Sequence, residues 1–134
     1  MKTISVYVEK AKDGTYWGTS KGLKGVVSAY GNSLKDLKKN FEQAFSDYIE
    51  LAKDLKEPYA DDYENVNFTY EMDLVGFFKL VPELKITAIA KKAGINSSLL
   101  RQYATGTANA SEERLKVIEK SVHKLGEELL SVSF

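Results

Sequence analysis

The sequence contains no cysteine and a single histidine among its 134 residues. Without cysteine it has neither a disulfide framework nor a thiolate metal site, and one histidine excludes a metal site built from several histidines of one chain. No apolar run approaches the ~20 residues that a membrane-spanning helix needs, and the first residues lack the pattern of a signal peptide. We therefore expect a soluble, cytoplasmic protein that uses no metal ion or other cofactor.

The charges balance overall but are unevenly distributed along the chain. Nineteen Lys and Arg residues match nineteen Asp and Glu residues, so the formal net charge is zero. The stretch between Glu83 and Glu112 has no acidic residue, and it carries the basic residues Lys85, Lys91, Lys92 and Arg101. Residues 54–64 show the opposite bias, with the acids Asp54, Glu57, Asp61, Asp62 and Glu64 against Lys56. Such blocks are usually solvated surface, and they indicate a binding face only where a motif coincides with them.

The first half of the chain shows the alternation typical of half-buried strands. Ile4, Val6 and Val8 alternate with polar and aromatic residues, and Asp13-Gly14 then predicts a tight turn. Further strands are predicted at residues 15–19, 26–30 and 66–70. A helix capped by Ser33 separates the last two, with apolar residues at spacings of three and four up to residue 55. Residues 1–72 are therefore expected to form a β-β-β-α-β domain, an antiparallel sheet backed by one long helix.

The second half, residues 73–134, contains no convincing strand and is expected to form an all-α domain. Helices are predicted at residues 73–81, 86–93, 97–105 and 112–130. Ser111 is a favourable cap for the last helix, and one side of that helix is apolar at heptad-like spacing, through Leu115, Ile118, Val122, Leu125 and Leu129. The expected fold class is α+β, divided between two small domains.

Residues 86–105 meet the steric requirements of a helix-turn-helix. Ala90 is small and stands inside the first helix, where the second helix must cross closely. Gly94 follows four residues later, at the place where the backbone turns with a positive φ. Ile95 then supplies the apolar residue that fills the angle between the helices. The inward positions of the second helix carry Leu99, Leu100 and Tyr103.

The polar residues of the same segment are left for its outward side. In a helix-turn-helix the exposed start of the second helix enters the major groove of DNA. There Arg can form two hydrogen bonds with the edge of guanine, and Asn or Gln can do so with adenine. Lysines neutralise the charge of the phosphates. The candidate DNA-binding residues are Asn96, Ser97, Ser98, Arg101, Gln102, Lys85, Lys91 and Lys92. The alternative is a plain helical hairpin in a bundle, with its polar residues in solvent.

Two sets of motifs together resemble a known family. Residues 3–72 resemble the antitoxin of the HicA–HicB toxin–antitoxin system, through Asp13–Gly18, Leu23–Ser28, Gly31 and the helix start Ser33–Asn40. Residues 73–132 resemble the lambda-repressor-like helix-turn-helix that is appended to many such antitoxins. The chain departs from the family at Lys24, where Pro is usual, at Thr15, and in the basic composition of Lys35–Lys39.

The resemblance implies a partial RNase H-like fold without nuclease activity for the first half. That half would bind a small RNA-cleaving HicA-type toxin and block its active site. The second half would dimerise on operator DNA and repress the shared operon, and toxin binding would tune the repression. Independently, the small size of each domain and the few base pairs that one recognition helix covers favour a homodimer or homotetramer.

Two groups of residues are candidates for contact with the toxin. A toxin that grips RNA needs a basic face, which the acids Asp54, Glu57, Asp61 and Asp62 could attract, although a solvated helix end and linker would have the same composition. Tyr16, Trp17 and Tyr30 could anchor the interface instead, since Trp and Tyr are common at binding hot spots. Packing of these aromatic residues in the core would explain them equally well.

Other functions are distinguished by specific features. A nuclease needs several converging carboxylates, whereas Glu9 and Glu71 lie at strand ends and Asp13 in a turn, so we expect no enzyme. The chain could instead be a stand-alone regulator whose first half senses a ligand or dimerises, or an interaction module that does not bind DNA. A neighbouring reading frame for a small basic protein favours the antitoxin, and a salt-dependent shift of promoter DNA excludes the interaction module.

Overall fold

The structure is a computed structural model that describes residues 1–134, and its strands and helices divide the chain after residue 72. Met1–Met72 form an α+β unit and Asp73–Phe134 form a unit of helices alone. None of the helices combines the length and the apolar character that a membrane crossing requires.

The first unit contains a four-stranded sheet in the order β3-β2-β1-β4. Its strands are β1 (Lys2–Lys10), β2 (Tyr16–Ser20), β3 (Ser28–Gly31) and β4 (Val66–Glu71). β2 is antiparallel to both β1 and β3, which places Trp17 between Glu9 on one side and Tyr30 on the other. β4 runs parallel to β1, with Phe68 opposite Ile4.

The expected all-antiparallel sheet is therefore wrong, because the β1–β4 pair is parallel and the sheet is mixed. The cause is α1 (Leu34–Asp54), the helix that joins β3 to β4. A helical crossover carries the chain back to the end of the sheet at which β3 begins, so the next strand runs parallel to β3 and to β1. Only the short connections between β1, β2 and β3 reverse the strand direction.

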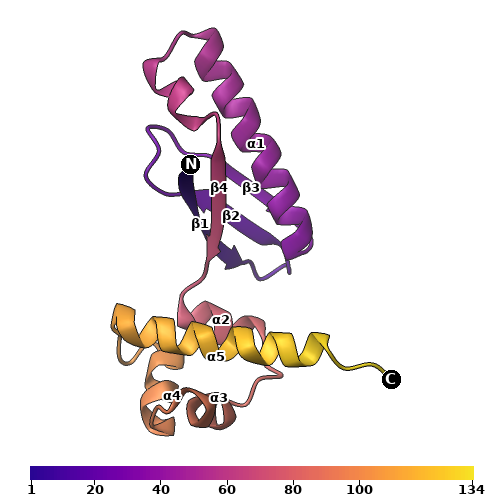
Figure 1. Cartoon of the computed structure of the whole chain (residues 1–134), viewed down its shortest axis with the longest axis vertical. Helices are drawn as coiled ribbons and strands as arrows, with labels where there is room; N and C mark the ends of the chain where they lie inside the picture. The colour runs from indigo at the N-terminus through magenta and orange to yellow at the C-terminus, as the bar shows by residue number, and fades with distance from the viewer. The chain divides into compact units, whose positions relative to one another are not determined.

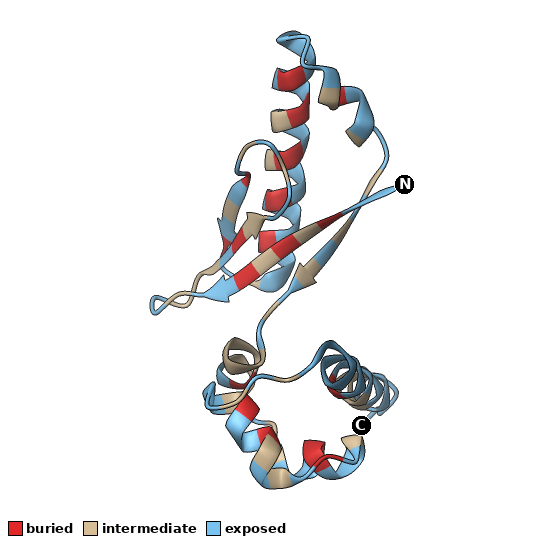
Figure 2. Ribbon diagram, turned by 90° about the vertical axis from the view of Figure 1, so that its left-hand side faces the viewer, coloured by how far each residue is buried: buried red, intermediate tan, exposed pale blue.

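α1 packs along one face of the sheet (Figure 1). Ser33 caps the helix, since its Oγ accepts a hydrogen bond from the backbone N–H of Asp36 at 3.0 Å. The buried residues recur at spacings of three and four and form a stripe along the helix (Figure 2), namely Leu37, Phe41, Phe45, Ile49 and Ala52. A short 3-10 helix, η1 (Pro58–Tyr63), follows α1 and leads into β4.

The second unit consists of α2 (Leu74–Leu80), α3 (Ile86–Ala93), α4 (Ser97–Thr105) and α5 (Glu112–Leu130). The predicted bounds of the last three helices are confirmed. Side chains cap three of the helices, because the carboxylate of Asp73 accepts from Gly76 N, the amide oxygen of Asn96 from Ser98 N, and the hydroxyl of Ser111 from Arg114 N. One core joins all four helices, built on Phe78, Ile89, Ala90, Ile95, Leu100, Tyr103 and Ile118.

Candidate functional site

α3 and α4 are connected by a tight turn that begins at Gly94. Gly94 has φ 69° and ψ 31°, so the predicted positive φ is confirmed. Its N–H donates to the carbonyl of Lys91 at 3.3 Å, and the N–H of Ile95 donates to the carbonyl of Ala90 at 2.9 Å. These two bonds form a Schellman motif, which ends a helix at a left-handed residue. Ala90 has no exposed surface and Ile95 is 9% exposed, so the turn holds α3 and α4 in close contact.

α4 divides its residues cleanly between core and solvent. Leu100 and Tyr103 are buried, while Arg101 and Gln102 are exposed. Ser98, Arg101, Gln102 and Thr105 follow the i, i+3, i+4, i+7 spacing of one helix face, and all four are exposed. Neither of the chain's two salt bridges involves Arg101, so its guanidinium is available to a partner.

The other predicted DNA-binding residues have different surroundings. The Oδ1 atom of Asn96 accepts hydrogen bonds from the N–H groups of Ser98 at 2.9 Å and Leu99 at 3.4 Å. Because this oxygen caps α4, Asn96 offers DNA its amide N–H groups but not the bidentate pairing with adenine. Ser97 is half-buried. Lys85 and Lys91 are exposed, at the start and in the last turn of α3.

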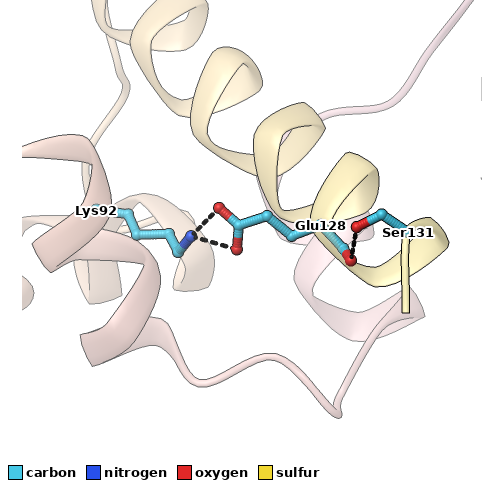
Figure 3. A network of polar contacts seen from close by, with 3 residues as sticks. All are labelled: Lys92, Glu128 and Ser131. Carbon is cyan, nitrogen blue, oxygen red and sulfur yellow. Dashed lines mark hydrogen bonds and ion pairs between the residues drawn. The ribbon is translucent and has the colours of Figure 1, made fainter. Parts of the chain in front are cut away.

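Lys92 is paired with an acid from α5 (Figure 3). Its Nζ donates to both carboxylate oxygens of Glu128 at 3.1 Å, and Ser131 Oγ donates to the backbone carbonyl of Glu128 at 2.8 Å. Residues 84–111 contain no acidic residue, but the fold places the carboxylate of Glu128 beside Lys92. The side chains of Lys92 and Glu128 are 38% and 52% exposed. An exposed ion pair contributes about 0–1 kcal/mol, so a phosphate can compete for Lys92.

The sheet of the first unit has one face that α1 does not cover, which we call the open face. Strand register places eleven residues on it: Thr3, Ser5, Tyr7 and Glu9 of β1, Trp17 and Thr19 of β2, Ser28 and Tyr30 of β3, and Asn67, Thr69 and Glu71 of β4. The rings of Trp17 and Tyr30 are stacked at 4.9 Å between centroids, and they are 43% and 57% exposed.

A chain of hydrogen bonds fixes the indole of Trp17. Its Nε1 donates to Thr15 Oγ1 at 3.0 Å, and that hydroxyl donates to Asp13 Oδ1 at 2.6 Å. The backbone N–H of Thr15 also donates to Asp13 Oδ1, at 3.0 Å. The bond from the Thr15 hydroxyl, followed by that from its N–H, lowers the pKa of Asp13 below its usual value. The turn between β1 and β2 thus orients an exposed ring.

The residues predicted to contact a toxin fall into separate groups. Tyr16 lies on the covered side of the sheet, where it packs against the core under the ammonium of Lys10, so it does not join Trp17 and Tyr30. Asp54, Glu57, Asp61 and Asp62 are exposed around the end of α1 and in η1. The Nδ2 of Asn40, near the start of α1, donates to the backbone carbonyl of Tyr30 at 2.8 Å, so Tyr30 lies beside that part of the helix. From Asn40 to Asp54 the helix rises about 20 Å, so one small contact does not include both groups.

Sequence reasoning missed the neighbours that define the open face. Glu9 lies opposite Trp17 and Glu71 lies opposite Tyr7. Alternation along β1 shows that Tyr7 and Glu9 share a side, but their partners across the sheet follow only from strand pairing. Thr105, on the exposed side of α4 with Arg101, was visible in the helical spacing of the sequence.

The carboxylates considered for a nuclease do not converge. No three or more His, Asp or Glu side chains of the chain are grouped so that they could hold a metal ion. His123 is an exposed residue of α5.

Comparison of the chain with models of known protein families, with curated proteins and with solved structures finds no match.

Proposed function

We propose that the chain is an antitoxin of the HicA–HicB type that also represses its own operon. In this proposal α3 and α4 form a lambda-repressor-like helix-turn-helix with α4 as the recognition helix. The first unit is a partial RNase H-like domain without nuclease activity, and it binds and neutralises a small RNA-cleaving toxin. The sequence resemblance described above supports both assignments, and the geometry of each unit supplies further support.

The observation that carries the DNA-binding part is the turn at Gly94 together with the outward side of α4. The Schellman turn and the buried Ala90 hold the two helices close, as a helix-turn-helix requires. The same arrangement leaves Arg101 and Gln102 exposed next to buried Leu100 and Tyr103. These two polar side chains are the types that form bidentate contacts with guanine and adenine in the major groove.

Phosphate contacts then fall to the lysines around this helix. Lys85 and Lys91 are exposed and take part in neither of the chain's salt bridges, so they are the first candidates. Lys92 contributes only if a phosphate replaces Glu128, which the exposed pair permits. Each phosphate contact releases bound cations from DNA, so affinity falls as the salt concentration rises.

A second copy of the chain completes the DNA site in this proposal. One recognition helix covers only a few base pairs, and a two-fold dimer on a palindrome is the usual solution. The apolar side of α5 is only partly used within the chain, since Ile118 is buried while Leu115 and Leu129 are 41% and 65% exposed. Sedimentation velocity of the wild type and of Leu129→Glu tests this contact, and a wild type that stays monomeric at micromolar concentration contradicts it.

The test of the DNA-binding part compares two sets of substitutions in the second unit. Arg101→Ala combined with Gln102→Ala should lower affinity for the promoter DNA of the chain's own operon at least about tenfold. Arg114→Ala is the matched control, because Arg114 is the only other arginine and lies on α5. Fluorescence anisotropy at several salt concentrations gives both affinity and salt slope. Equal affinity of wild type and double variant overturns the assignment of α4.

The test of the antitoxin part is co-expression with the product of the reading frame next to that of the chain, which under this proposal is a small basic toxin. The wild type should rescue cells from the growth arrest that this protein causes, and the Arg101 and Gln102 double variant should rescue them equally. Failure of the wild type to rescue growth, while promoter binding persists, favours the stand-alone regulator.

A further inference from the structure

We propose that Trp17, Tyr30 and Glu9 on the open face form a docking site for an arginine side chain of a basic protein partner. The inference rests on the proposed function, in which that partner is the toxin, and it names the surface that the toxin contacts. Three features of the first unit support it: a fixed pair of exposed rings, the absence of a cation over these rings, and carboxylates beside them.

The rings are prepared for binding before a partner arrives. Trp17 and Tyr30 stack at 4.9 Å with an angle of 25° between their planes, although both are more than 40% exposed. The bond from Trp17 Nε1 to Thr15, and from Thr15 to Asp13, holds the indole from its other end. Because these contacts within the chain restrict both side chains, less conformational entropy is lost on binding. Exposed Trp and Tyr of this kind are the residues most often found at binding hot spots.

Most other aromatic rings of the first unit already carry a cation. A lysine ammonium lies within 5.4 Å of the ring centroid at five tyrosines: Tyr63, Tyr16, Tyr7, Tyr59 and Tyr70. Trp17 and Tyr30 have no such lysine, even though an indole is the strongest cation acceptor among the aromatic side chains. The site that attracts a cation best is thus the one that the chain leaves open.

Two carboxylates on the open face lack an internal partner. Glu9 lies directly across from Trp17 and Glu71 directly across from Tyr7. Directly opposed side chains on one face of an antiparallel pair have Cβ atoms about 5 Å apart. Both acids are exposed, and the two salt bridges of the chain involve neither. A guanidinium stacked on Trp17 therefore has a carboxylate within reach, and arginine can use both its flat face and its N–H groups.

The same rings resemble a stacking platform for single-stranded nucleic acid, which an exposed sheet with aromatic residues can provide. The charges argue against this partner. Phosphates would approach Glu9 and Glu71, and the ammonium of Lys21 lies over the ring of Tyr7 at 5.2 Å, not over Trp17 or Tyr30. Charge complementarity thus favours a basic protein over RNA.

The chain's single tryptophan provides a direct test. Full-length protein is titrated with a soluble peptide of alternating Arg and Gly, with a Lys-Gly peptide of equal charge, and with a ten-nucleotide oligouridine, while Trp17 fluorescence is recorded. We expect the Arg peptide to change the emission with the highest affinity of the three. Glu9→Gln should weaken its binding about fivefold, whereas Glu50→Gln, an exposed acid on α1, should leave it unchanged. Tighter binding of oligouridine, or equal binding of the Arg peptide by Glu9→Gln, overturns the proposal.

A second measurement separates this proposal from the proposed function. Trp17→Ala should weaken binding of the Arg peptide, measured by calorimetry, and of the neighbouring basic protein about thirtyfold or more, the range of a hot spot. Circular dichroism and thermal unfolding establish that the variant is folded. If the neighbouring protein binds Trp17→Ala as tightly as the wild type, the docking site is wrong while the antitoxin function stands. If the Arg peptide binds as expected but the wild type fails to rescue growth, the antitoxin function is wrong and the arginine site stands.

Discussion

The two units differ in how their candidate binding residues are placed relative to the core. In the first unit the core lies between the sheet and α1, and Trp17 and Tyr30 occupy the opposite face. In the second unit α4 serves both purposes, because exposed Arg101 and Gln102 are flanked by buried Leu100 and Tyr103. A substitution on the open face can thus change the candidate binding surface without changing the core of the first unit. A change in the backbone of α4 moves the candidate binding residues and the core residues of the second unit together.

The two units also differ in why each requires a glycine at one position of its backbone. Gly31 ends β3 under the start of α1, where an added Cβ would lie 2.5 Å from the backbone nitrogen of Leu37. Gly94 has open space around it, with nothing within 4 Å of an added Cβ, but its φ of 69° disfavours other residues. The first unit needs glycine for a close approach of two elements, and the second needs it for a turn.

The largest effect that tests the separation of the units is expected from Phe41→Ala. Phe41 is fully buried and meets the rings of Phe68 and Tyr70 edge to face. We expect a loss of about 3–5 kcal/mol in the free energy of unfolding of the first unit. Urea unfolding followed by Trp17 fluorescence measures it, with Leu51→Ala, 58% exposed on the same helix, as the control. Unfolding of the second unit is followed by the methyl NMR signals of Ile118. An equal loss in its free energy of unfolding contradicts the expectation that the two units unfold independently.

Gly31→Ala should have the next largest effect, about 2 kcal/mol in the same unit, because the start of α1 must move away from β3. The cause is steric, so a larger residue at position 31 should cost more than alanine. Trp17 fluorescence again reports the unfolding free energy. An alanine variant as stable as the wild type shows that α1 adjusts freely and that the close approach is unimportant.

Gly94→Ala should cost the second unit about 1 kcal/mol, since only the left-handed backbone is penalised. Asn tolerates this conformation better, so Gly94→Asn should cost less than Gly94→Ala although its side chain is larger. This order is the reverse of that expected at Gly31. Thermal unfolding followed by the Ile118 methyl signals checks it, and a greater loss with Asn than with Ala rejects the backbone explanation.

The sequence predicts elements whose causes are local, and it fails where the cause is distant. Helical spacing and caps predict the bounds of α3, α4 and α5, and the position of Gly94 predicts its φ. The pairing of β4 with β1 depends on where the α1 crossover returns the chain, which no local pattern records. Strand alternation places Tyr16 and Trp17 on opposite faces of β2, but it does not say which of the two faces α1 covers. The pairing of Lys92 with Glu128 joins residues 36 positions apart.

That long-range pair provides a smaller test, which rests on the proposed DNA-binding function. Glu128→Gln removes the acid that holds Lys92, so affinity for promoter DNA should rise about twofold to fivefold. The plot of log affinity against log salt concentration should also steepen by about one phosphate contact. Glu127→Gln is the control, because Glu127 is an exposed neighbour on α5 that takes part in neither salt bridge. Equal gains from both variants indicate a general charge effect and not the release of Lys92.

The smallest effect is expected when the pH is lowered, and it concerns the hydrogen bonds that hold the indole of Trp17 in the first unit. Hydrogen bonds from Thr15 lower the pKa of Asp13 from its ordinary value of 3.8. A carboxyl group whose pKa is lowered on folding stabilises the folded state above the unfolded pKa, and it loses that contribution as pH falls through the folded pKa. Protonated Asp13 accepts more weakly from the Thr15 hydroxyl that in turn holds Trp17 Nε1. Trp17 fluorescence should therefore change below pH 3.8, with a midpoint equal to the Asp13 pKa measured by carboxyl NMR. Asp13→Asn should abolish this change, and its persistence in that variant would assign the change to another carboxylate.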